Sequence, residues 1–161
     1  MAKKQKTKVV KPRKPTFIER SLTIEDAISE AYGELQTLGE EMREAYDNTP
    51  ESLQNSGVGE ARGEAADNLE NISEPNVPEE LMGDKFTFKF NSSTKKKTSR
   101  SDRRYEAVET LQAVSAFLGD IEENRDGKYS KEEVQAASDF VQDVDQMVDE
   151  AEAVDFPGMY G

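Results

Sequence analysis

The chain has 161 residues, of which 34% are apolar, and a formal net charge of −13 with no cysteine and no histidine. The missing residue types exclude disulfides, thiolate and imidazole metal sites, cysteine and serine–histidine nucleophiles, and the usual acid–base catalyst of neutral pH. Because no cluster of side chains assembles the roles that a reaction needs, we predict that the protein is not an enzyme and has no small-molecule substrate.

The positive charges are concentrated in two segments. Residues 1–20 contain eight lysines and arginines and one glutamate, and residues 95–104 contain six and one aspartate, whereas the rest of the chain is strongly acidic. Basic segments of this kind attract polyanions, so we predict that they contact nucleic acid or an acidic protein surface. They can instead dock on the acidic helices of a second copy, which makes a homo-oligomer. The predicted polyanion-binding residues are Lys3, Lys4, Lys6, Lys8, Lys11, Arg13, Lys14, Lys95, Lys96, Lys97, Arg100, Arg103 and Arg104.

Residues 1–16 combine like charges with two prolines, which prevents burial of apolar surface, and we predict a disordered basic arm. From residue 17 the pattern changes to that of a helical hairpin, which we predict over 17–72. Ser21 or Thr23 can cap its first helix, with Asp26 in the reciprocal position, and the following apolar residues repeat at intervals of four and three. A second long helix completes the hairpin, and its glycines and alanines favour close approach of the two helices.

Residues 73–84 contain two prolines and are predicted to form a linker. The next segment, 85–104, is predicted to hold a short strand and a basic loop. Phe86, Phe88 and Phe90 share one face of this strand, where they pack as core against a helix, take part in strand pairing, or stack on unpaired bases. We predict an isolated strand, whose backbone bonds go to a second copy, a partner strand, a weak strand around residues 9–10, or water.

The segment 105–155 is predicted to be a second helical hairpin. A serine can cap the start of each helix, Ser99 or Ser101 for the first and Ser130 for the second. Apolar residues of the last helix repeat every three and four positions, the strongest amphipathic pattern in the chain. The aromatic tail 156–161 either folds back on the bundle or inserts into a partner. The predicted fold class is therefore mainly α, with two amphipathic helical hairpins in a small bundle, one short isolated β-strand and a disordered basic arm.

The loop between the last two helices resembles the twelve-residue calcium loop of an EF-hand. Its oxygen ligands would be Glu122, Asn124, Asp126, Lys128 through the backbone, Ser130 and Glu133. Glu122 replaces the aspartate usual at the first position, and the sequence has no second loop of this type for the usual pairing. The same residues suit a plain capped turn, because Ser130 and Glu133 form a capping box. A calcium-binding, EF-hand-like helical protein is therefore one alternative function.

Five stretches of the chain carry a family resemblance: Phe17–Tyr32, Glu41–Gln54, Gly63–Asp67, Ser73–Pro78 and Asp155–Tyr160. They resemble small acidic helical proteins, without assigned function, that tailed bacteriophages encode. The resemblance implies a phage setting, with the protein a virion component or an early accessory protein, and it transfers no functional residues. Because the chain has no long apolar run, we expect neither a membrane span nor a signal peptide, and we predict location in the host cytoplasm or the virion.

The function predicted from these features is that of a non-enzymatic, phage-type accessory or structural protein, whose basic segments contact nucleic acid or an acidic protein assembly. The acidic helices favour a further alternative, since rows of carboxylates can mimic the phosphates of a duplex and inhibit a host DNA-binding protein. The basic segments argue against mimicry, because a mimic gains nothing from segments that attract real polyanions.

Overall fold

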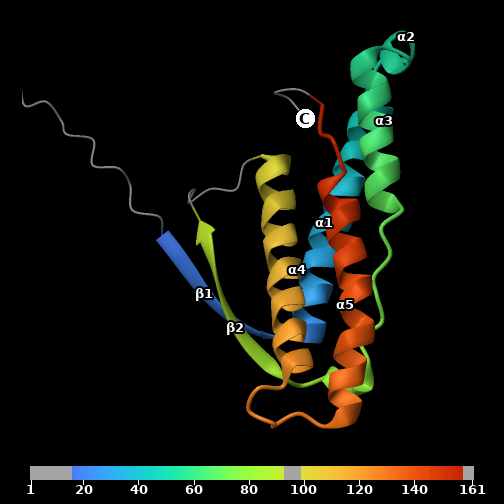
Figure 1. Ribbon diagram of the computed structural model, residues 1–161. Coiled ribbons are helices and arrows are strands. Elements are labelled where there is room, and N and C mark those ends of the chain that lie inside the picture. The colour runs from blue at the N-terminus through green and yellow to red at the C-terminus, as the bar shows by residue number, and fades with distance from the viewer. Residues whose placement is uncertain (1–15, 93–98, 158–161) are drawn as a thin grey trace, which may run out of the picture.

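The computed structural model describes residues 16–92 and 99–157 as a helical bundle with a two-stranded ribbon at its side (Figure 1). The predicted mainly α fold is confirmed. None of the helices in these two ranges is long and apolar enough to cross a membrane. The elements in chain order are β1 (Thr16–Thr23), α1 (Ile24–Asp47), α2 (Glu51–Gln54), α3 (Gly57–Glu70), the 3-10 helix η1 (Glu79–Leu81), β2 (Lys85–Ser92), α4 (Arg100–Glu123) and α5 (Lys131–Glu152).

The segment 16–23, predicted as the start of the helical hairpin, is instead the strand β1. Helix α1 begins only after Thr23, whose hydroxyl accepts a hydrogen bond of 3.1 Å from the Asp26 N–H. Upstream of this cap, exposed Glu19 and Ser21 alternate with half-buried Arg20 and Leu22, a period of two that suits a strand with one covered face. The predicted cap is confirmed, and the prediction of helical structure before it is wrong.

Strands β1 and β2 form an antiparallel ribbon, with Thr16 opposite Ser92 at one end and Thr23 opposite Lys85 at the other. The prediction of an isolated strand is therefore wrong, because β1 supplies the hydrogen-bonding partner that the backbone of β2 requires. Residues 9–10, one of the predicted partners, lie outside the described residues, as do residues 1–15 of the predicted disordered arm.

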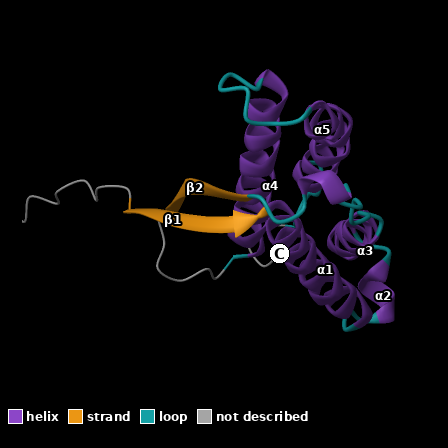
Figure 2. Cartoon of the chain, turned by 90° about the horizontal axis from the view of Figure 1, so that it is seen from below, coloured by secondary structure: helices purple, strands orange, loops and turns teal. Residues whose placement is uncertain are grey.

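Two helix pairs form the body of the molecule, as predicted. Helix α1 packs against α3 and α4 packs against α5, while contact between α1 and α4 joins the pairs (Figures 1 and 2). Their buried apolar side chains form one continuous core. Burial of one large aliphatic side chain contributes about 1.5 to 3 kcal/mol to the stability of the fold. Because the core is continuous, this burial stabilises both pairs together. The largest fully buried side chains are Ile24, Ile28, Leu35, Leu38, Met42, Leu69, Ile72, Leu81, Leu111, Leu118, Ile121 and Val114.

Residues 73–84, predicted as a linker, include part of this core. Leu81 of η1 is fully buried, and η1 packs against α5. Val77 is half-buried against the same cluster. The segment therefore contributes to the core that both helix pairs share.

Helix α3 approaches its neighbours closely at two glycines. A Cβ atom on Gly59 would lie 2.4 Å from the carbonyl oxygen of Leu53, far inside normal contact distance. A Cβ atom on Gly63 would lie 3.1 Å from the ring of Tyr46 on α1. The predicted role of small residues in close helix approach is confirmed. A residue with a Cβ atom would collide with the backbone at Gly59 and would crowd the Tyr46 ring at Gly63.

Candidate functional site

The second basic run is divided by the structure. Its lysines, Lys95, Lys96 and Lys97, lie outside the described residues. Its arginines, Arg100, Arg103 and Arg104, lie in the first turns of α4, just after the N-cap Ser99. The N-terminal turns of a helix carry partial positive charge, so cations there gain stability only from acidic or carbonyl partners. The structure provides such partners for these arginines.

Arg103 joins α4 to α1 through two carboxylates. Its Nε donates a hydrogen bond of 2.5 Å to Glu34 Oε1, and its Nη1 and Nη2 lie 2.9 and 2.7 Å from the two carboxylate oxygens of Glu41. The hydrogen bond from Arg103 lowers the pKa of Glu41 below its ordinary value and raises the pKa of Arg103. Arg100 adds a longer contact, with its Nε 3.4 Å from Glu41 Oε1. Both guanidinium groups therefore face acidic partners on α1.

Arg104 caps the C-terminal end of α5. Its Nη1 donates to the carbonyl oxygens of Ala151, Glu152 and Val154, at 3.2, 3.3 and 2.7 Å. Its guanidinium carbon also lies 5.5 Å from the centre of the Phe156 ring. Phe156 is half-buried against the core, so the described start of the tail folds back onto the bundle, one of the two predicted outcomes. Residues 158–161 lie outside the described residues.

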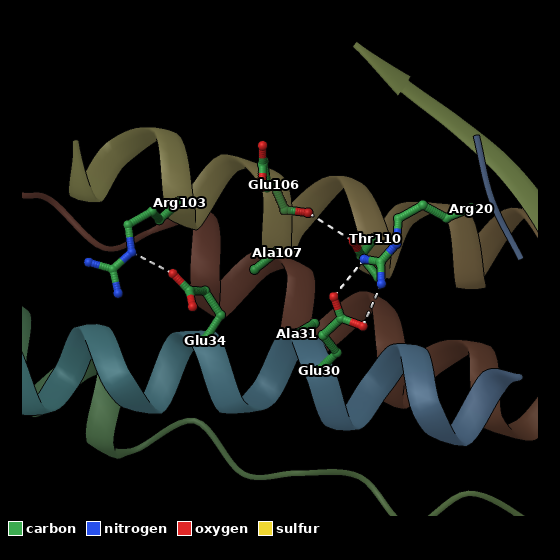
Figure 3. A pocket seen from close by; sticks show the side chains of 8 residues that line it. All are labelled: Arg20, Glu30, Ala31, Glu34, Arg103, Glu106, Ala107 and Thr110. Atoms are coloured by element: carbon green, nitrogen blue, oxygen red, sulfur yellow. Dashed lines mark hydrogen bonds and ion pairs between the residues drawn. The ribbon is translucent and has the colours of Figure 1, made fainter. Parts of the chain in front are cut away.

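A cleft of about 350 Å³ lies between α1, α4 and β1 (Figure 3). Arg20 enters it from β1 and donates two hydrogen bonds to Glu30, of 2.5 and 2.8 Å, which raise the pKa of Arg20. Arg103 and Glu34 line the same cleft. Each guanidinium has a carboxylate partner, and Glu106 adds a third acid, so the cleft does not suit a polyanion. The remaining lining residues are Ala31, Ala107 and Thr110.

Arg20 and its partner Glu30 were not among the residues that the sequence singles out. The signal for them is weak, because it depends on recognising residues 16–23 as a strand. In that strand Arg20 and Leu22 share the face turned toward the helices, and a cation on such a face needs an acid within reach. The pair joins the ribbon to α1.

The ribbon brings the attachment points of the two lysine-rich segments together. Residues 1–15 join β1 at Thr16, and residues 93–98 follow β2 at Ser92, the residue opposite Thr16 in the register. The two segments contain ten lysines and arginines and no acidic residue. They are far apart in the sequence, yet the antiparallel pairing fixes the points from which they extend at one end of the ribbon.

The aromatic face of β2 is turned toward α4. Phe86 is 7% exposed, and its ring stacks on Phe117 with centroids 5.0 Å apart and planes inclined by 14°. Phe88 is half-buried and stacks on Phe86 at 5.4 Å. The prediction that these phenylalanines pack as core against a helix is confirmed for Phe86 and Phe88, while the side chain of Phe90 lies outside the described residues.

The opposite face of the ribbon is polar and largely exposed over the residues whose side chains are described. It carries Glu19 and Ser21 of β1 and Lys85, Thr87 and Lys89 of β2. Lys89 Nζ lies 4.0 Å from Glu19 Oε2, and the two side chains are 65% and 61% exposed. Ion pairs as exposed as this one contribute little to stability, so both lysines remain accessible to a ligand. The sequence pattern places Lys85, Thr87 and Lys89 on one face, although it does not by itself mark them as binding residues.

The loop that resembles an EF-hand is held by local hydrogen bonds. Asn124 adopts the left-handed conformation with φ of 46°, and its side chain donates to the Tyr129 carbonyl and accepts from the Tyr129 N–H, each at 3.0 Å. Ser130 and Glu133 form the capping box, in which each side chain accepts from the other residue's N–H at 3.1 Å. The capped-turn interpretation therefore accounts for three of the six predicted calcium ligands.

The other predicted calcium ligands do not converge. Glu122 lies within the last turn of α4, and Asp126 and Lys128 are exposed in the loop. Within residues 16–92 and 99–157, no group of three or more acidic side chains is arranged to hold a metal ion. Calcium binding stays a prediction for which the structure supplies no ligand set.

Comparison of the chain with protein-family models, curated proteins and solved structures finds no match. The functional conclusion below therefore depends on the strand register, the charges and the side-chain contacts described above.

Proposed function

We propose that the protein is a non-enzymatic nucleic-acid-binding accessory or structural protein, of the kind that tailed bacteriophages encode. An acidic helical body holds a β-ribbon, and the lysine-rich segments 1–15 and 93–98, which extend from one end of that ribbon, contact the phosphate backbone. The observation that carries the proposal is the pairing of Thr16 with Ser92, since it gives two separate basic segments a common origin.

The position of the ribbon supports this proposal. In both views the end of the ribbon at which β1 begins and β2 ends projects outward past α4, on the side away from α3 and α5 (Figures 1 and 2). Helix α4 therefore lies between the acidic helix α5 and the end of the ribbon from which the basic segments continue. Ten cations in segments that join the same end of the ribbon can neutralise several phosphates, which gives binding that depends steeply on salt and little on sequence.

The arginines of α4 narrow the proposal to fewer residues. Arg103 and Arg104 are held by carboxylates of α1 and carbonyl groups of α5, as described above. Removing them from those partners to bind a phosphate would break contacts within the bundle. We therefore assign nucleic-acid contact to the lysine-rich segments, chiefly to Lys95, Lys96, Lys97 and the lysines and arginine of residues 1–15.

The experiment is a binding titration with labelled nucleic acid at about 50 and about 200 mM salt, a range over which several phosphate contacts change affinity by orders of magnitude. It compares the full chain, the chain without residues 1–15, and the triple variant Lys95→Gln, Lys96→Gln, Lys97→Gln. A matched control, Arg125→Gln, Lys128→Gln, Lys131→Gln, removes three exposed charges from the loop and start of α5. We expect weaker binding from the truncation and the first triple variant and no comparable loss from the control.

Absence of binding by the full chain at the lower salt concentration would overturn the proposal. Equal losses from the two triple variants would also overturn it, because the effect would then reflect net charge alone. Binding to polyglutamate as tight as to nucleic acid would instead identify an acidic protein as the partner.

A further inference from the structure

We infer that the outer face of the ribbon, formed by Ser21, Lys85, Thr87 and Lys89, is a docking surface for the backbone of duplex nucleic acid. This inference rests on the proposed function. It adds that the nucleic acid is a duplex and that described residues of the ribbon contact it. All four residues are exposed, and the antiparallel register places Ser21 directly opposite Thr87. Two ammonium groups and two hydroxyl groups on one face are the donors that phosphate oxygens accept from.

The charge of this face is complementary to a polyanion. Lys85 and Lys89 outnumber Glu19, whereas the chain as a whole has a net charge of −13. The ribbon face is thus a positive surface on an acidic protein, and it is continuous with the ribbon end from which residues 1–15 extend. Residues 1–15, which join the ribbon at Thr16, contain seven lysines and arginines and no acidic residue.

Phe86 and Phe88 of β2 are not available to stack on the bases of a single strand. Proteins that bind single strands without sequence preference stack bases on exposed aromatic rings. Here Phe86 and Phe88 point toward the helices and stack on one another and on Phe117. The register places Phe17 on the outer face too, but its side chain lies outside the described residues, and the side chains described on that face are polar. Polar side chains suit contact with backbone phosphates, which a duplex presents in two closely spaced rows.

The outer face of the ribbon suits contact with the phosphate backbone and not with base edges, because its other face packs against α4. Hydroxyl and ammonium groups on such a face position a protein on the phosphates and carry no sequence information. Binding should therefore be independent of base sequence.

The test compares the full-length double variant Lys85→Gln, Lys89→Gln with the wild type, using a short duplex and each of its single strands at several salt concentrations. Each lost phosphate contact should lower the slope of log affinity against log salt by about 0.9, equivalent to about eightfold in affinity at 0.1 M salt. Glu19→Gln should act in the opposite direction and tighten binding, since it removes the one acid of the face. Arg125→Gln, Lys131→Gln is the matched control, because it removes two exposed cations outside the ribbon.

The outcomes separate this inference from the proposed function. If the Lys85/Lys89 variant binds the duplex like the wild type while loss of residues 1–15 weakens binding, the ribbon face is excluded and the proposed function stands. If single strands bind more tightly than the duplex, assignment of the duplex is overturned. If the full chain binds neither form, the proposed function and this inference fail together. Unchanged thermal unfolding of the variants shows that binding effects do not come from loss of the fold.

Discussion

Arg103 on α4 and Glu41 on α1 are 62 residues apart in the sequence, yet both carboxylate oxygens of Glu41 lie within 2.9 Å of the guanidinium group. The contact lies where the two helix pairs meet, and Glu34 accepts a further hydrogen bond from the same arginine. A cation from a segment predicted to bind polyanions is thus part of the interface between α1 and α4. Its removal should affect stability before it affects binding.

Arg103→Ala should lower the free energy of unfolding by about 2 kcal/mol, because Glu34 loses its donor and Glu41 keeps only the longer contact with Arg100. Arg103→Lys should recover only part of this loss, since an ammonium group cannot bond both acids in the same geometry. Urea denaturation measures the effect. Arg125→Ala, at a side chain that is 83% exposed, is the control and should leave the midpoint unchanged.

The effect of Arg103→Ala should also depend on pH. The pKa of Glu41 is lowered in the folded protein, so the stability that its ionised form contributes is present above the ordinary pKa of glutamate, about 4.3, and is lost as the pH falls below it. The difference between wild type and variant should therefore shrink in acid. A difference that stays constant down to pH values well below that range would show that Glu41 is not the partner that matters.

Asp84→Asn should stabilise the protein at neutral pH. Burial raises the pKa of Asp84, Glu133 and Glu25 raise it further, and Lys128 opposes them. Among the described residues, Asp84 Oδ2 is buried without a hydrogen-bond partner. Because the folded pKa exceeds the unfolded one, about 3.9, folding is most favourable below that value and loses stability as the pH rises through the folded pKa. The gain from asparagine should appear above this window and vanish below it, in thermal unfolding measured across pH, with Asp126→Asn as the exposed control.

Arg104→Ala should loosen the end of α5 without unfolding the bundle. Three carbonyl oxygens and the Phe156 ring lose their common partner, which removes about 1 kcal/mol for each net hydrogen bond that water does not replace. Hydrogen exchange should show faster exchange in the last turn of α5 and unchanged protection in α1. Uniformly faster exchange throughout the protein would contradict a local capping role.

Gly59→Ala and Gly57→Ala should change stability in opposite directions. A methyl group on Gly59 would meet the Leu53 and Gln54 carbonyl groups at 2.4 and 2.5 Å, so about 1 to 3 kcal/mol should be lost. No atom lies within 4 Å of the corresponding position at Gly57, where alanine should stabilise the start of α3 by about 0.4 to 1 kcal/mol. Thermal unfolding of the two variants measures both signs, and equal effects would contradict the described packing at α2.

Ser130→Ala should destabilise the protein by about 1 kcal/mol, because it removes the N-cap of α5. The loss should be the same with and without millimolar calcium if the capping box is the role of this residue. A rise in the unfolding temperature of the wild type with calcium, abolished in the variant, would favour the EF-hand interpretation instead.

Local signals in the sequence were enough to predict most of the helical structure. The intervals of three and four in α1 and α5 place Leu35, Leu38, Val144 and Val148 on buried faces, and the structure buries all four. The caps Thr23 and Ser130 were recognisable because each bonds a residue only three positions away.

Contacts between distant residues could not be predicted in this way. Strand β1 depends on a partner that lies beyond all of α1, α2 and α3, so its own eight residues carry too little pattern to identify it. The arginines of α4 look like part of a basic run until the fold supplies Glu34, Glu41 and the end of α5 as partners. For the candidate site, the sequence indicates the charge of the basic segments and the alternation of β2, and the register shows that both segments join the same end of the ribbon.

The ribbon also has a consequence for how the protein folds. Every residue of α1, α2 and α3 lies between Thr16 and Ser92, so the two strands can pair only after this part of the chain has been made and has turned back on itself. Closing so long a loop is slow and entropically unfavourable, which makes ribbon formation a late event. A newly synthesised chain therefore has its basic N-terminal segment before it has the partner strand, and the two basic segments acquire their common origin only after β2 has been made and has paired with β1.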